Sequence, residues 1–187
     1  MTVIDYLNRM VIEATSPDGN VHARVSAGPE VELWFRPGAV DRYTEDRLEH
    51  QLSRLASATA AAYLRGQAEA YRRADDIDPA ETDGSRSEDP RRRRFTEALN
   101  AVRGEGSSAR GTVGVRTVGL VRWAVEIRPG TLRRLDEQLL LSELHSALAA
   151  LLRDREMKIT LLKAEIYDLG LPSSWRDAVA RRRGRPR

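Results

Sequence analysis

Two clusters of arginine are the residues whose type and spacing best suit a chemical role in this sequence. One is the run from Arg91 to Arg94, and the other is the segment 181–187, which reads RRRGRPR. A guanidinium presents its N–H donors in a rigid fork that matches phosphate and carboxylate oxygens. The clusters therefore indicate contact with phosphates, or else solvated charge in a chain whose composition favours arginine throughout.

The segment at the end of the chain has the more specific pattern. Gly-Arg-Pro flanked by arginines resembles an AT-hook, in which glycine lets the backbone lie deep in a narrow A·T minor groove and proline keeps it extended. The alternative is a solvated basic tail. For the internal run, the alternatives are a second DNA contact and a charged tether. The candidate DNA-binding residues are Arg181, Arg182, Arg183, Gly184, Arg185, Pro186, Arg187, Arg91, Arg92, Arg93 and Arg94.

No pattern in the sequence indicates catalysis, a metal or a cofactor. The chain has no cysteine, which excludes thiolate zinc sites, disulfides and cysteine nucleophiles. His22, His50 and His145 lack metal-site spacing and a neighbouring acid and nucleophile, so we expect them at the surface. The glycine-rich segment 104–111 does not have the spacing of a phosphate-binding loop. We therefore expect a non-enzymatic protein.

Composition places the chain among globular proteins with a polar surface. Of its 187 residues, 41% are hydrophobic and 32% are charged. The N-terminus lacks the long apolar stretch of a signal peptide, and no apolar run approaches the roughly 18 residues that span a bilayer. We expect a cytoplasmic protein with no membrane contact. The net charge of +3 is too small to indicate DNA binding by the whole fold.

The elements that must position these residues begin with three short strands over residues 10–36. Apolar residues alternate with polar ones in each run, and turns at 16–20 and 28–29 separate the runs, which predicts an antiparallel meander. Trp34 falls on the face opposite Val31, Leu33 and Phe35. We expect packing to cover it, and the alternative is an exposed tryptophan that marks an interface or a stacking platform. A long helix should then run from about Thr44 to about Ala74, with Thr44 as N-cap.

The same pattern returns 92 positions later. Gly19 corresponds to Gly111, the RPG at 36–38 to the RPG at 128–130, and Leu48 to Leu140, without a gap. The alternative is coincidence among short strands rich in glycine and valine. The first strand has only the glycine-containing segment 102–107 opposite it, which predicts a weak or missing strand. The second helix carries an apolar stripe from Leu141 to Leu169, interrupted near Arg155, and should end at Gly170.

These observations divide the chain into four parts. They are a first unit at 1–74, a disordered charged linker at 75–94, a second unit at 95–171, and a short helix with a basic tail at 172–187. The expected fold class is α+β, with two ββ(β)α units that each combine a short antiparallel sheet and a long C-terminal helix. A short helix over about 2–9 precedes the first strand.

The segments SPDGNVHARV and GPEVELWFRPGAV, followed by a long helix rich in alanine and leucine, resemble the YbaB/EbfC family of nucleoid-associated proteins, in particular its actinobacterial members. The stretch GTVGVRTVGLVRWAVEIRPGTL is similar again. The resemblance implies homodimer-like pairing, here as an intrachain pseudo-dimer. It also implies DNA binding with little sequence preference. Similar YbaB-like proteins accompany type VII secretion and are not known to act through DNA.

Two classes of function therefore remain open from the sequence. The first is a nucleoid-associated protein that binds DNA through its arginine clusters. The second is a protein-interaction scaffold or chaperone-like module, associated with type VII secretion, that presents apolar surface to a protein partner. Self-association through the long helices is compatible with both.

Overall fold

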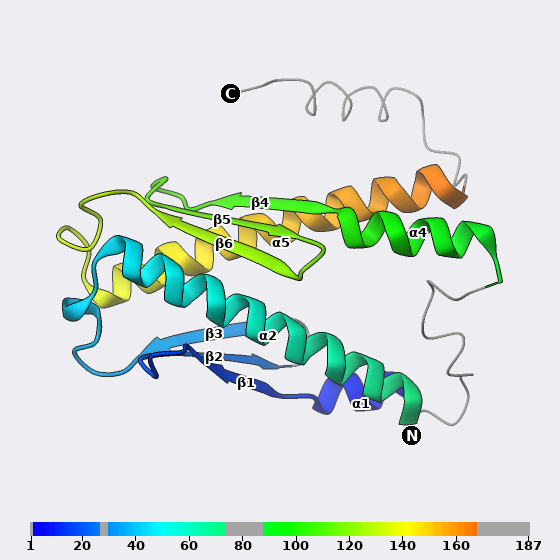
Figure 1. Ribbon diagram of the computed structural model, residues 1–187, viewed down its shortest axis with the longest axis horizontal. Coiled ribbons are helices and arrows are strands. Elements are labelled where there is room, and N and C mark those ends of the chain that lie inside the picture. The colour runs from blue at the N-terminus through cyan, green and yellow to red at the C-terminus, as the bar shows by residue number, and fades with distance from the viewer. Residues whose placement is uncertain (1, 27–29, 74–87, 168–187) are drawn as a thin grey trace.

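Two copies of one arrangement of strands and helix make up the fold. The computed structural model describes residues 2–26, 30–73 and 88–167 (Figure 1). In the first unit, the elements are α1 (Val3–Arg9), β1 (Ile12–Thr15), β2 (Val21–Ser26), β3 (Glu30–Phe35), a 3-10 turn (Val40–Arg42) and α2 (Glu45–Arg73). In the second, they are α4 (Pro90–Ala101), β4 (Arg103–Ser107), β5 (Val113–Val118), β6 (Arg122–Ile127) and α5 (Glu137–Tyr167). The predicted α+β class and its two units are confirmed.

Each unit contains a three-stranded antiparallel sheet, which we call sheet A (β1-β2-β3) and sheet B (β4-β5-β6). The two sheets share one register. Val21 pairs with Phe35 in sheet A, and Val113 pairs with Ile127 in sheet B, so both partners are displaced by the offset read from the sequence. The RPG turns agree as well, because Gly38 and Gly130 have φ of 70° and 78°. Glycine enters this left-handed region without steric cost.

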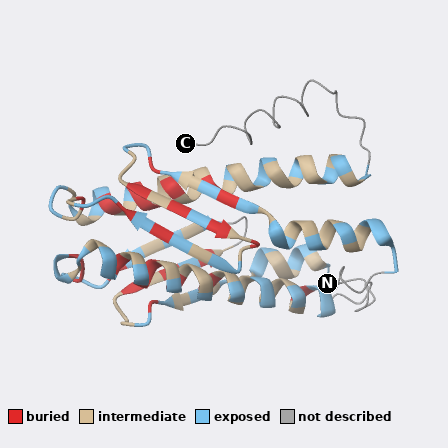
Figure 2. Ribbon diagram, turned by 45° about the horizontal axis from the view of Figure 1, so that its top comes forward, coloured by how far each residue is buried: buried red, intermediate tan, exposed pale blue. Residues whose placement is uncertain are grey.

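A single core joins the two units. Buried side chains alternate along the strands, as Figure 2 shows, and each sheet turns its apolar face towards the helices. Helix α2 packs on β6 of the other unit as well as on β1 and β2, and α5 packs on β3 as well as on β4 and β5. Leu48 of α2 and Leu140 of α5 are both fully buried in one cluster. The expected intrachain pseudo-dimer is therefore present.

Polar contacts along the edge strands β6 and β3 hold the units together. The backbone N–H groups of Val125 and Ile127, on the edge strand β6, donate to Ser53 Oγ at 2.9 Å and Glu49 Oε1 at 2.6 Å. On the opposite side, His145 Nε2 lies 3.2 Å from the carbonyl oxygen of Val31 on β3. Ser53 and His145 are equivalent positions of the repeat. The prediction that His145 lies at the surface is wrong, because its ring is partly buried between the units.

In each unit, a hydrogen bond joins the turn between the first two strands to the long helix. The residues that form this bond differ in charge between the two units. The Asp18 N–H donates to Gln51 in the first unit, and the Arg110 N–H donates to Glu143 in the second. Burial disfavours the charged form of Glu143, but hydrogen bonds from Ser108 and Thr112 outweigh it and hold the pKa of Glu143 below its ordinary value. The two units thus share the geometry of this contact although the equivalent residues differ in charge.

Strand β4 corrects the expectation that the second unit has a weak or missing first strand. It pairs with β5 along its whole length, with Ser107 opposite Gly114. Its second glycine, Gly106, is required by the close approach of α5. A Cβ atom at Gly106 would lie 2.2 Å from the Ala147 carbonyl oxygen and 2.3 Å from the Leu151 nitrogen. The low strand propensity of glycine is therefore offset by helix packing that no larger residue permits.

Helix boundaries follow the predictions with one exception. Helices α1 and α2 agree with the expected ranges, and the predicted end of α5 at Gly170 lies outside the described residues. The expected linker over 75–94 is wrong at its C-terminal end, since α4 begins at Pro90. Asp89 caps this helix by accepting from the Arg91 N–H at 2.8 Å, and proline at the first position suits helical φ.

Candidate nucleic-acid interface

The four internal arginines lie in the first turn and a half of α4. Arg91 and Arg94 are exposed, and Arg92 and Arg93 are half-buried. Each helix N-terminus carries a partial positive charge. Acidic residues in the first turn therefore stabilise the helix, and basic residues there destabilise it. Helices α2 and α5 follow this rule, with Glu45 and Glu137 in their first turns, whereas α4 has no acid there. Four arginines against Glu88 and the N-cap Asp89 leave this end of α4 with a positive charge, which together with the helix dipole suits anions.

Helix α4 places its arginines near the described end of α5. The two helices pack side by side, and the rings of Phe95 and Tyr167 lie 5.8 Å apart between centroids (Figure 1). Tyr167 is the last described residue of α5, so the chain continues from this point toward the basic segment 181–187. That segment lies outside the described residues. The structure therefore assigns a place to the internal arginine cluster and leaves the C-terminal one a prediction.

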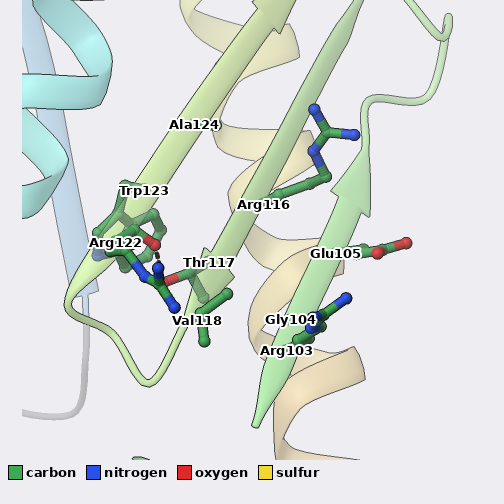
Figure 3. Close-up of a pocket in the computed structure, with 9 residues that line it drawn as sticks. All are labelled: Arg103, Gly104, Glu105, Arg116, Thr117, Val118, Arg122, Trp123 and Ala124. Atoms are coloured by element: carbon green, nitrogen blue, oxygen red, sulfur yellow. Dashed lines mark hydrogen bonds between the residues drawn. The ribbon is translucent and has the colours of Figure 1, made fainter. Parts of the chain in front are cut away.

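A second group of arginines lies on the outer face of sheet B, where the sequence alone indicates no site. Arg103, Val118 and Arg122 form one row across the three strands, and Glu105, Arg116 and Ala124 form the next. They line an open hollow of about 470 Å³, shown in Figure 3. Arg116 is held by Glu126. Arg103 and Arg122 have no ion pair among the described residues. Val102 alone separates Arg103 from the C-terminal end of α4, whereas Arg91 to Arg94 lie at the other end of that helix.

The equivalent face of sheet A has the opposite charge. Its rows are Glu13, Arg24 and Glu32, then Thr15, His22 and Trp34, with Glu30 at the end of β3. Glu30 corresponds to Arg122 in the repeat, and Glu32 corresponds to Ala124. Two outer faces on one backbone scaffold have therefore diverged, one toward acids and one toward arginines.

The charge difference extends to the whole units. Residues 88–167 contain 15 lysines and arginines against 11 aspartates and glutamates, a difference of +4. Residues 2–73 contain 9 against 10, a difference of −1. The described positive charge is thus concentrated in the second unit, and the small net charge of the chain conceals it. Alternation along the strands reveals the arginine row on sheet B only once β4 is recognised as a strand.

Trp34 lies on the outer face of sheet A and is 39% exposed, so the prediction that packing covers it is wrong. It stacks on His22 with ring centroids 5.4 Å apart and an interplanar angle of 16°. Trp123, in the second unit, instead packs against the core and donates its indole N–H to the Leu120 carbonyl oxygen at 2.9 Å. Of the two tryptophans among the described residues, only Trp34 is exposed, and it lies on the acidic outer face of sheet A.

The described residues contain no group of three or more histidine, aspartate or glutamate side chains arranged to hold a metal ion. Within the same residues, no helix has the length and apolar character to cross a membrane. Comparisons with protein-family models, curated proteins and solved structures found no match.

Proposed function

We propose that the chain is a non-enzymatic, nucleoid-associated protein of the cytoplasm that binds DNA largely without sequence preference. The arginine cluster of α4, the arginine row of sheet B and the AT-hook-like segment 181–187 would contact DNA. The observation that carries the proposal is the position of Arg91 to Arg94 at the N-terminus of a helix, where they oppose the helix dipole. A bound phosphate reduces this conflict, because it is attracted by the arginine side chains and by the positive end of the helix dipole.

The arrangement favours phosphate contact over reading of bases. Arg103 and Arg122 lie on the two edge strands of sheet B, about 10 Å apart across the sheet, and both are exposed. Such cations on a flat sheet face can meet the charged backbone but do not project into a groove. Contacts of this type give binding that depends on salt and varies little with sequence. The two similar units, each with a sheet and a long helix, agree with what the resemblance to the YbaB/EbfC family implies, and we propose membership of that family on this basis.

The proposal is tested by fluorescence anisotropy with a labelled duplex of about 30 base pairs, over a range of salt concentrations. The variant R91S/R92S/R94S should bind at least tenfold more weakly at low salt. The salt dependence should also fall, by about 0.9 in log–log slope for each phosphate that the variant no longer neutralises. Arg93 is left unchanged because its guanidinium bonds the Glu88 carbonyl oxygen at 3.1 Å.

The matched control neutralises three exposed arginines of the first unit, R36S/R54S/R65S, with the same change in charge. It should lose threefold or less in affinity. Equal losses in both variants would show that only net charge matters and would contradict the assignment to the second unit. Absence of binding by the unaltered protein at low salt would overturn the DNA-binding function.

The second candidate function, a protein-interaction scaffold or chaperone-like module of type VII secretion, is favoured by the exposed Trp34. Exposed tryptophans are enriched at protein interfaces. This function predicts a partner protein that is retained by the unaltered chain and released by Trp34→Ala, with or without nuclease treatment. Retention that disappears after nuclease treatment would instead indicate that DNA bridges the two proteins.

A further inference from the structure

The outer face of sheet A has a rigid aromatic surface at its centre. Thr15 Oγ1 lies 3.0 Å from His22 Nδ1, and the His22 ring stacks on Trp34. These three residues are direct neighbours across β1, β2 and β3. Because the hydrogen bond orients the imidazole and the imidazole supports the indole, Trp34 is held in one position on the sheet while much of its surface meets solvent.

Two carboxylates lie on one side of this aromatic surface. Glu32 precedes Trp34 by two residues on the same face of β3, and Glu30 by four. Glu32 lies 3.7 Å from Arg24, whose guanidinium is held more closely by Glu13 at 2.7 Å. Glu30 has no ion pair among the described residues. Three acids against two arginines, Arg24 and the exposed Arg36 that follows Trp34 by two residues, leave the face with one net negative charge. Both acids of β3 precede the indole, so the negative charge lies on that side of it.

An exposed indole with carboxylates beside it suits a guanidinium. The ring face attracts the cation, and the carboxylates accept its N–H donors in bidentate geometry. The carboxylates disfavour DNA as a ligand of this face, because its phosphates would meet like charge. The ligand chemistry that the face selects is therefore an arginine-rich peptide.

We propose that the outer face of sheet A binds the arginine-rich segment 181–187 of the same molecule. The segment carries five arginines and no acid, which complements the charge of the face. Thirteen residues separate Tyr167 from Arg181, and a chain of that length spans up to about 45 Å. An arginine of the segment stacks on Trp34 while Glu30 and Glu32 pair with its neighbours. If the segment also contacts DNA, as the proposed function holds, the acidic face competes with DNA for it.

Indole N–H signals in ¹H–¹⁵N spectra of the full-length protein test this contact. The chain has three tryptophans, and substitution of each by phenylalanine assigns its signal. In the full chain with all five arginines of 181–187 replaced by serine, the Trp34 signal should move. A peptide of sequence RRRGRPR, titrated into that variant, should return the signal toward its original position. The Trp123 signal should stay in place, since that indole bonds the Leu120 carbonyl oxygen.

Two acid substitutions make the test specific. In the serine-substituted chain, E30Q/E32Q should weaken peptide binding about tenfold. The control E97Q/E156Q, which changes two other exposed acids, should keep the affinity for the peptide within twofold.

A Trp34 signal that is unchanged by replacement of the five arginines would overturn the proposal and direct attention to the acidic segment 75–83 as their partner. If the Trp34 signal differed between the two chains only at high protein concentration, the contact would lie between molecules, which would contradict the proposal of contact within one molecule. No DNA is present, so failure here leaves the proposed function standing, and failure of DNA binding leaves this contact standing.

Discussion

Alanine at position 106 is expected to destabilise the folded protein by about 3 kcal/mol, although the change adds a single methyl group. The added Cβ would lie 2.2 Å from the Ala147 carbonyl oxygen and 2.9 Å from the Leu151 Cα. Both atoms belong to the backbone of α5, so no side-chain rotation relieves the overlap, and the helix must move away from β4. The gain from restricting the unfolded chain, about 0.4 to 1 kcal/mol, offsets only part of this cost.

Chemical denaturation of Gly106→Ala against Gly114→Ala measures the effect. Gly114 lies on the outer face of β5, where the nearest atom to an added Cβ is the Glu126 Cβ at 3.9 Å. Its substitution should change the free energy of unfolding by less than about 0.5 kcal/mol. If Gly106→Ala were as stable as the original protein within about 1 kcal/mol, the close packing of α5 on β4 would be wrong.

Truncation of Leu48 or Leu140 to alanine should each lower the free energy of unfolding by about 3 kcal/mol, within the range of roughly 2 to 5 for buried leucines. The two residues are equivalent in the repeat, are fully buried and belong to the same core cluster. Because that cluster contains residues of both units, each substitution should shift one common unfolding transition. Circular dichroism and tryptophan fluorescence should report the same midpoint.

Partly exposed leucines on the same helices provide the controls. Leu139→Ala and Leu64→Ala, at residues that are 37% and 38% exposed, should each cost less than about 1 kcal/mol. Two separate transitions, with Leu48→Ala shifting one and Leu140→Ala the other, would show that the units fold independently. That result would contradict a shared core and the pseudo-dimer with it.

Much of the fold could be predicted because the repeat supplied each signal twice. The RPG turns, the alternating strand faces and the acid-rich start of each long helix recur at one offset, and the registers of sheets A and B differ by that offset. Periodicity alone leaves short strands ambiguous. Two copies that agree in turn, face and helix cap remove much of that ambiguity.

The wrong predictions have different physical origins, some in tertiary contacts and one in a local signal at a helix start. Sequence propensity underestimates β4 because glycine has low strand propensity, whereas Gly106 is needed for the approach of α5. Charge density alone places the start of α4 in a disordered linker, although Asp89 and Pro90 form a recognisable N-cap and first position. The expected cover over Trp34 is missing because stacking on His22 supports the indole on an open face.

The candidate site could be predicted in part. The run from Arg91 to Arg94 is easy to identify in the sequence, and its place at a helix start is indicated only by the Asp89-Pro90 pair that precedes it. The row of Arg103 and Arg122 consists of isolated residues that become neighbours only through the pairing of β4, β5 and β6. A net charge of +3 gives no sign of the contrast between units that carry +4 and −1.

Chemical-shift mapping of the full-length, ¹⁵N-labelled protein with a short DNA duplex at low salt tests the division between the two units most directly. We expect perturbed amides to cluster in α4, β4 and β6, with the outer faces of β1 and β3 responding only where the segment 181–187 leaves them. Perturbations confined to sheet A, or none in either unit, would contradict the account.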